Sequence, residues 1–107
     1  MRYTLRFIPE VAEDAIAGYT WYEGKSQGLG EEFLCIFYAC ASEIPRGPSA
    51  FPKIHREIRR CLLRRFPYAI YFMAANDQII VLGLFHCARD PGTIGKKLRY
   101  RGEPESP

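Results

Sequence analysis

The chain has 107 residues, of which 48% are hydrophobic, 14% aromatic and 25% charged. This composition is typical of one globular domain that builds its core without disulfides, and it excludes a disordered or fibrous protein. No apolar run approaches the roughly 20 residues that cross a membrane, and the first ten residues lack the apolar segment of a signal peptide. We therefore expect a cytoplasmic protein with no membrane contact.

The net charge of +3 is divided unevenly along the chain. Residues 1–46 carry a net charge of −3, whereas residues 47–107 carry a net charge of +6. Charge separated in this way predicts one basic surface that meets an anionic or acidic partner.

The cysteines and histidines show no pattern of metal ligands. The four cysteines form no C-x-x-C pair, and the chain has only two histidines. Most of the cysteines sit within apolar patterns, which predicts small buried hydrophobes in a reducing compartment. We therefore expect neither a metal site nor another cofactor.

The first predicted elements are a short strand and a helix. Residues 2–8 alternate between polar and apolar side chains, which predicts a half-buried strand. Pro9 follows, and the acidic residues just after it suit the first turn of a helix. Apolar side chains then recur at helical spacing as far as Tyr22, so residues 9–25 are predicted to be a helix with one apolar stripe.

A second helix is predicted after a glycine-rich break at residues 26–30. The helical period resumes over residues 31–44, and Pro45 ends it because proline disfavours helical backbone in the residue before it. Two helices joined by so short a connector are expected to lie antiparallel as a hairpin. Their apolar stripes then require a sheet to cover them.

The stretch from Arg59 to Arg89 predicts three consecutive strands. Its first part alternates partly and is interrupted by Pro67, which has no N–H to give to a sheet. An aromatic, extended run follows and ends at Asn76-Asp77, residues that tolerate the positive φ of a tight turn. Residues 78–87 are almost entirely apolar, as is typical of a strand covered on both faces.

The predicted fold class is therefore α+β. An N-terminal strand and an antiparallel two-helix hairpin pack on a small, mostly antiparallel sheet that three C-terminal strands complete. Residues 1–91 make up this single domain, and the order of the strands is left open. Residues 92–107 are polar and basic, with few apolar side chains, and are predicted to be a mobile tail.

Several short motifs recur in the order and spacing of a known family. They are the opening strand into Pro9, Trp21-Tyr22, Gly28-Leu29-Gly30 before Phe33, Phe51-Pro52, Arg64-Arg65-Phe66-Pro67-Tyr68, Tyr71, and the closing Phe85-His86-x-x-Arg89-Asp90-Pro91. Over roughly residues 1–91 the chain resembles the RelE/ParE superfamily of toxins from type II toxin–antitoxin modules, closest to the ParE-like plasmid stabilisation branch. Many relatives carry a short helix after this point, whereas here Gly92-Thr93-Ile94-Gly95 precedes the basic segment.

The resemblance implies a growth-inhibiting bacterial toxin in complex with a cognate antitoxin, whose disordered segment folds across the toxin surface. ParE-like members poison DNA gyrase, and RelE-like members cut messenger RNA on the translating ribosome. Our main hypothesis is a gyrase-binding toxin without chemistry of its own. The alternatives are a ribosome-dependent endoribonuclease and a degenerate toxin retained as a binding module.

The ribonuclease hypothesis assigns catalytic roles to three residues. His86 would act as general acid or base, while Arg65 and Arg89 would hold the scissile phosphate. The lysine-rich active site of the RelE type is not visible in this sequence. A histidine that closes an apolar strand is also often a packing residue, and this structural role is the preferred interpretation of His86.

Five arginines are candidates for binding the antitoxin or the target: Arg59, Arg60, Arg64, Arg65 and Arg89. On a regular strand Arg60 and Arg64 would share one face, and the odd-numbered pair the other. One pair is expected to bridge to helix carboxylates such as Glu13 or Glu43. The other pair is then available to a partner, because arginines beside apolar strands are costly unless paired.

Overall fold

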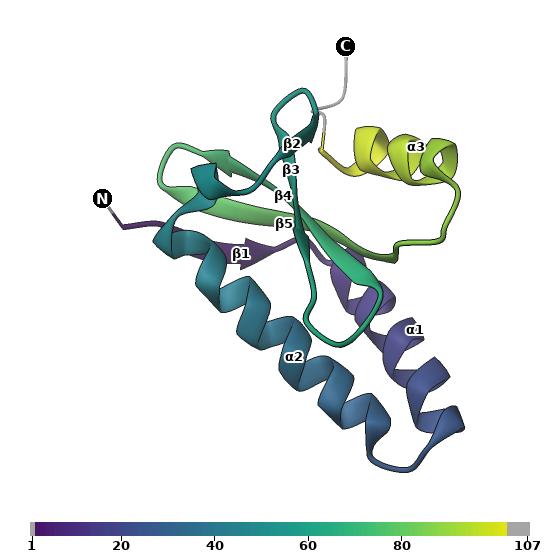
Figure 1. Ribbon diagram of the computed structural model, residues 1–107. Helices are drawn as coiled ribbons and strands as arrows, with labels where there is room; N and C mark the ends of the chain where they lie inside the picture. The colour runs from purple at the N-terminus through teal and green to yellow at the C-terminus, as the bar shows by residue number, and fades with distance from the viewer. Residues whose placement is uncertain (1, 103–107) are drawn as a thin grey trace.

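The computed structural model describes residues 2–102 and consists of three α-helices and one five-stranded sheet (Figure 1). The elements in chain order are β1 (Thr4–Phe7), α1 (Glu10–Lys25), α2 (Leu29–Glu43), two short 3-10 helices (Ile44–Arg46 and Pro48–Ala50), β2 (Lys53–His55), β3 (Ile58–Leu62), β4 (Tyr68–Ala75), β5 (Gln78–His86) and α3 (Pro91–Gly102). The strand order is β1-β5-β4-β3-β2, and only the β1–β5 pair is parallel. The predicted α+β class with a mostly antiparallel sheet is confirmed. Within this part of the chain, no helix is long and apolar enough to cross a membrane.

The helical hairpin of α1 and α2 covers one face of the sheet, as Figure 1 shows. Gly28 makes the turn between the helices with a φ of +89°, a left-handed conformation that glycine adopts without strain. The Glu23 carboxylate accepts hydrogen bonds from the N–H groups of Gly28 and Gly30, each at 2.9 Å. Phe33 and Phe37 of α2 are fully buried against the sheet. The hairpin therefore supplies one side of the main core, and the sheet supplies the other.

Gly18 allows α1 to approach Phe33 of α2 closely. A Cβ added at Gly18 would lie 2.4 Å from the Phe33 ring. We expect Gly18→Ala to lower the free energy of unfolding by about 1–3 kcal/mol through overpacking, although alanine is the better helix former by about 1 kcal/mol. Urea denaturation measures the change. Gly24→Ala is the matched control on the same helix, since nothing lies within 4 Å of its added Cβ, and a Gly18 variant as stable as this control would contradict the packing argument.

Strand β5 is covered on both faces, as its apolar run predicts. Val81 and Leu84 face the core under the helical hairpin. Phe85 faces the other way and packs in a second cluster with Ile94 and Leu98 of α3. In Figure 1, α3 lies across the sheet from α1 and α2. The central strands are therefore sandwiched between two helical layers.

Residues 91–102 form α3 instead of the predicted mobile tail. Asp90 caps the helix by accepting a hydrogen bond from the N–H of Thr93 at 3.0 Å, and Pro91 begins the first turn. Ile94 and Leu98, four residues apart, are buried on the sheet. Two apolar residues at helical spacing are enough to dock a helix on a sheet face that is already apolar. A helix thus follows Asp90-Pro91, so the expected departure from the family pattern at Gly92-Thr93-Ile94-Gly95 is wrong. Residues 103–107 lie outside the described part of the chain.

The structure also corrects the predicted strands around residues 53–65. Lys53–His55, which precedes the three predicted strands, forms strand β2, so four strands instead of three follow the hairpin. Strand β3 ends at Leu62, and Arg65 has a φ of +70°. The predicted strand alternation therefore does not extend to Arg64 and Arg65.

The cysteines divide between the core and the surface. Cys40 and Cys61 are buried, as predicted, and burial raises the pKa of the Cys61 thiol to about 11. Cys35 and Cys87 are exposed, which differs from the predicted role of all four as buried hydrophobes. No group of three His, Cys, Asp or Glu side chains within residues 2–102 is arranged to hold a metal ion.

An ion pair between α1 and α3 closes the edge of β5 beyond the end of β1. The pairing of β1 with β5 stops at Val81. Past this point the Asp14 carboxylate accepts a hydrogen bond from the N–H of Leu84 at 3.2 Å, and Arg101 donates to the carbonyl of Leu82 at 3.1 Å. Asp14 and Arg101 also pair with each other at 2.7 Å, with side chains only 9% and 11% exposed. The ion pair thus takes the place of a neighbouring strand.

Candidate functional site

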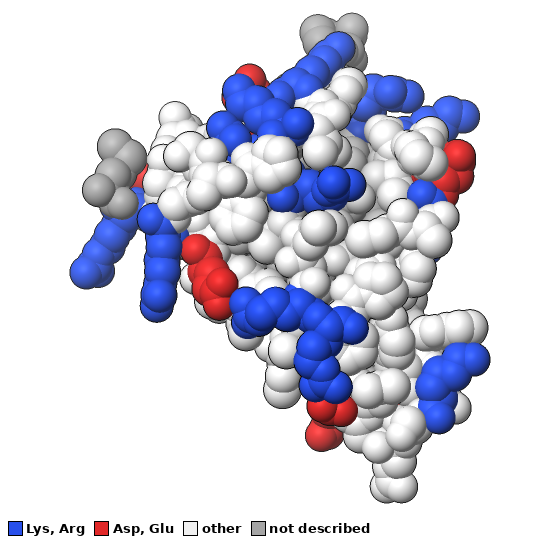
Figure 2. Space-filling model, in the orientation of Figure 1, with Lys and Arg blue, Asp and Glu red and all other residues white. Residues whose placement is uncertain are grey.

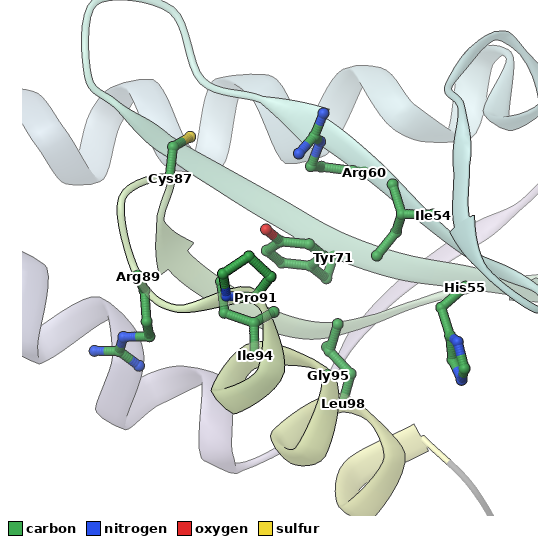
Figure 3. Close-up of a pocket in the computed structure, with 10 residues that line it drawn as sticks. All are labelled: Ile54, His55, Arg60, Tyr71, Cys87, Arg89, Pro91, Ile94, Gly95 and Leu98. Carbon is green, nitrogen blue, oxygen red and sulfur yellow. The ribbon is translucent and has the colours of Figure 1, made fainter.

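A pocket of about 320 Å³ opens between the sheet and α3 (Figure 3). Strands β2, β3 and β4, the connection after β5, and α3 all contribute to its walls. Apolar side chains such as Ile54, Ile94 and Leu98 form part of the lining. The pocket exists only because α3 is folded against the sheet.

Four polar side chains line this pocket: His55, Arg60, Tyr71 and Arg89. Tyr71 lies in the middle of the group in Figure 3, with His55 and Arg89 at opposite ends. Arg60 and Tyr71 are cross-strand partners, and their side chains both line the pocket. Burial raises the pKa of Tyr71, with Arg60 acting in the opposite direction, so the phenol stays protonated at neutral pH. The pocket therefore presents a cation, Arg60, on the strand next to a neutral hydroxyl, Tyr71.

Two atoms of the pocket residues are buried without a hydrogen-bond partner in the described part of the chain. They are Nε2 of His55 and Nε of Arg60. A buried polar group that lacks a partner costs roughly 1–3 kcal/mol. An incoming group that reaches either atom would recover this cost, so the pocket favours a polar or anionic ligand over an apolar one.

His86 lies outside the set of residues that line the pocket. Its ring packs edge-on against Tyr68, with centroids 5.1 Å apart. Its Nδ1 atom accepts a hydrogen bond from the N–H of Ala88 at 2.9 Å. The His86 ring therefore already makes one hydrogen bond and one aromatic contact with its neighbours.

Arg64 and Arg65 are both engaged with the helical hairpin. Arg65 pairs with Glu32 at 2.8 Å, and Arg64 pairs with Glu43 at 3.2 Å. All four side chains are about half exposed, so each pair contributes roughly 0–1 kcal/mol. Glu43 is one of the two carboxylates named in the sequence analysis. The other, Glu13, does not pair with these arginines, and Glu32 pairs with Arg65 instead. The two bridging arginines are also neighbours in a turn, so they do not divide by strand face as predicted.

Of the three residues of the ribonuclease hypothesis, the structure places only Arg89 at the pocket. Arg65 points to α2, as its pair with Glu32 shows. Arg89 lies on the opposite side of the sheet, where it lines the pocket and covers the Phe85 ring at 5.2 Å. His86 stays with Tyr68. Any chemistry in the pocket would therefore need residues other than Arg65 and His86.

Of the five candidate arginines, the pocket contains two. Arg59 donates to the backbone carbonyl of Phe51, which holds the loop before β2. Arg60 and Arg89 line the pocket, and neither has a carboxylate partner in residues 2–102. The structure therefore separates arginines that hold the fold from arginines that face a cavity.

Sequence reasoning missed His55 and Tyr71 as pocket residues. His55 belongs to a three-residue strand too short to show alternation, and Tyr71 reads as an ordinary core aromatic. The pairing of Arg60 with Tyr71 depends on the register between β3 and β4. The nearest available signal is the Ile58-x-Arg60 spacing, which places Arg60 on the face of a buried residue.

The chain is similar to known proteins in its three-dimensional structure. No family model matches the chain, and no curated protein matches it. The structure of a chromosomal ParDE toxin–antitoxin system from P. aeruginosa matches with a TM-score of 0.69 and 18% identity, covering 79% of this chain and 96% of that one. The structure of the free E. coli toxin RelE, in which two arginines are replaced by alanine, matches with a TM-score of 0.60 and 13% identity. The match covers 94% of this chain and 98% of that one. The chain therefore has the RelE/ParE toxin fold, as its sequence motifs imply.

Proposed function

We propose that the chain is the toxin of a type II toxin–antitoxin module and is neutralised by a cognate antitoxin. The fold shared with a ParDE system and with the toxin RelE supports this, as does the basic C-terminal half that an acidic antitoxin segment would cover. Expression of the chain alone should arrest growth, and the protein encoded by the adjacent gene should restore growth and co-purify with the chain. Continued growth, with a chain that stays monomeric beside that protein, would rule out the module.

We infer that the toxin acts in the ParE manner, by docking on DNA gyrase without chemistry of its own. The observation that carries this inference is the pocket, where Arg60 and Arg89 have no carboxylate partner in residues 2–102 while His86 is engaged elsewhere. Arginine and tyrosine are enriched among the residues that dominate protein–protein binding energy. An acidic side chain of the target, seated on the pocket floor, would pair with Arg60 beside Tyr71.

A supercoiling assay with purified gyrase tests this mode of action. The chain is expected to inhibit supercoiling and to increase the amount of cleaved DNA held by the enzyme. A defined messenger RNA should stay intact when the same preparation is added to a cell-free translation reaction. Unchanged gyrase activity at concentrations that arrest growth would reject the gyrase mechanism.

His86→Ala is expected to leave gyrase inhibition within about twofold of the unsubstituted protein. The reason is that His86 contacts Tyr68 and Ala88 and does not line the pocket. Loss of the edge-on ring contact should lower the free energy of unfolding by about 0.5–1.5 kcal/mol. Inhibition and urea denaturation are measured on the same sample, and a folded variant with a tenfold or greater loss of inhibition would place His86 in the working site.

A second candidate function is RNA cleavage in the pocket with His55 in place of His86. The observation that favours it is the buried, unpartnered Nε2 atom of His55 in a pocket that also holds Arg60. A histidine is a suitable general acid or base, and an arginine binds phosphate oxygens well. Primer extension on a messenger during cell-free translation would then show cuts in phase with codons, and His55→Ala would abolish them while His86→Ala would not.

A further inference from the structure

Cys87 is an exposed thiol that lines the pocket, and the proposed function does not use it. It lies in the connection between β5 and α3, where its N–H donates to the carbonyl of Pro67 at 2.8 Å. In Figure 3, Cys87 and Arg89 lie at one end of the pocket and His55 at the other. Burial raises the pKa of Tyr71, and the Cys87 thiol adds to that rise, so the thiol is close to the phenol. The backbone therefore holds a nucleophile in the pocket wall.

The pocket places two cations around this thiol. Arg60 and Arg89 line the same cavity of about 320 Å³, and neither pairs with a carboxylate in residues 2–102. The Nε atom of Arg60 is also buried there without a hydrogen-bond partner in these residues. On the face of the molecule in Figure 2, Lys and Arg side chains predominate over Asp and Glu. An anionic molecule is therefore attracted to the chain and meets two guanidinium groups beside the thiol.

The other exposed cysteine, Cys35 of α2, has different electrostatic surroundings. Glu31 and Glu32 stand four and three residues before it, so both share its side of the helix. Arg65 offsets the charge of Glu32, which leaves the charge of Glu31. The chain thus carries one exposed thiol among cations and one beside a net negative charge, which makes Cys35 an internal control for Cys87.

We propose that Cys87 is a redox-modification site that takes an anionic, low-molecular-weight disulfide of the glutathione type. The Cys87 thiolate attacks one sulfur of the small disulfide, so that a new S–S bond forms to Cys87 and the original S–S bond breaks. The half that leaves keeps the electron pair of the broken bond and takes up a proton from solvent, in place of the one that Cys87 lost. The small disulfide is itself the oxidant, so the step needs no other reagent. Carboxylates of the attached half then pair with Arg60 and Arg89.

The attached group would occupy the pocket and neutralise its two cations. This consequence rests on the proposed function, because it matters only if Arg60 and Arg89 dock on gyrase. Chain that carries the mixed disulfide is expected to need about tenfold or more protein for half-inhibition of gyrase than the same sample after dithiothreitol. In Cys87→Ser, the samples with and without disulfide treatment should inhibit gyrase equally.

The rates of modification at Cys87 and Cys35 test the site itself on the full chain. Glutathione disulfide is added at low ionic strength, and the mixed disulfide at each cysteine is followed by mass spectrometry of peptides. Cys87 is expected to react about tenfold faster than Cys35 or more, and the cationic disulfide cystamine should reverse this preference. Arg60→Gln/Arg89→Gln should bring the two rates with glutathione disulfide within about threefold of each other. Arg2→Gln/Arg6→Gln removes the same charge from exposed positions near the N-terminus and should keep the preference.

Two results would overturn the modification site: equal rates at Cys87 and Cys35 with glutathione disulfide, or a preference for Cys87 that is unchanged by Arg60→Gln/Arg89→Gln or by cystamine. Equal inhibition of gyrase by the modified and reduced chains, after excess disulfide is removed, would overturn the effect on docking. Failure of the proposed function looks different, because the reduced chain would then leave gyrase fully active. The rates at Cys87 and Cys35 would still decide whether the site exists.

Discussion

Replacing Asp14 with alanine is expected to lower the free energy of unfolding by about 3–5 kcal/mol. The change leaves the Arg101 guanidinium, only 11% exposed, without its carboxylate partner. It also removes the acceptor of the Leu84 N–H at the edge of β5. Because Arg101 belongs to α3, the loss should loosen the helix that forms one wall of the pocket. Urea denaturation at neutral pH measures the effect.

Two further variants identify the cause of that loss. Glu13→Ala removes the neighbouring, exposed carboxylate of α1 and should change the stability by no more than about 0.5 kcal/mol. The double variant Asp14→Leu/Arg101→Met replaces the pair by apolar side chains and should recover the part of the loss that comes from the unpaired charge, while the Leu84 N–H stays without its acceptor. If Asp14→Ala costs less than 1 kcal/mol, the pair does not hold α3 to the sheet.

Arg60→Ala is expected to raise the concentration of toxin that half-inhibits gyrase by about 30-fold or more. This corresponds to the loss of at least about 2 kcal/mol that truncation of a central arginine causes at an interface. Arg60 is well suited to such a role because it lines the pocket and its Nε atom is buried there without a hydrogen-bond partner in residues 2–102. Arg60→Lys should also lose most of the effect, since an ammonium group cannot reproduce the planar, two-pronged contact.

The control for this prediction is Arg59→Ala. Arg59 is the sequence neighbour on the same strand, but it donates to the Phe51 carbonyl and does not line the pocket. We expect this variant to lose some stability, by about 0.5–1.5 kcal/mol, while keeping its potency against gyrase. Equal losses of potency for Arg59→Ala and Arg60→Ala, in folded proteins, would mean that the pocket has no special part in binding.

The sequence predicts the elements of this fold well because their signals are local. Pro9 and Pro45 bracket the helical hairpin, and the apolar run of β5 indicates a strand covered on both faces. The same kind of local signal marks α3. Asp90-Pro91 is a typical helix start, and Ile94 and Leu98 follow four residues apart, which puts both on one face of the helix. The density of charge after residue 95 favours the opposite prediction, because it is typical of solvated tails.

The pocket could not be predicted because it depends on contacts between distant parts of the chain. Arg60 meets Tyr71 only through the register of β3 with β4, and α3 closes the pocket only once it docks. In the same way, the turn at Arg65 sends that side chain to Glu32, although strand alternation would have placed it elsewhere. Composition predicts that this domain has a basic surface, whereas tertiary structure decides which arginines are left to face a partner.

The most direct test of the central claim compares two double variants in the gyrase supercoiling assay. Arg60→Ala/Arg89→Ala removes the pocket cations, and Arg64→Ala/Arg65→Ala removes the same charge from the exposed pairs with α2. We predict that the first variant no longer inhibits gyrase and that the second inhibits it like the unsubstituted protein. Full inhibition by the pocket variant, with inhibition lost in the other, would contradict the assignment of the pocket as the docking site.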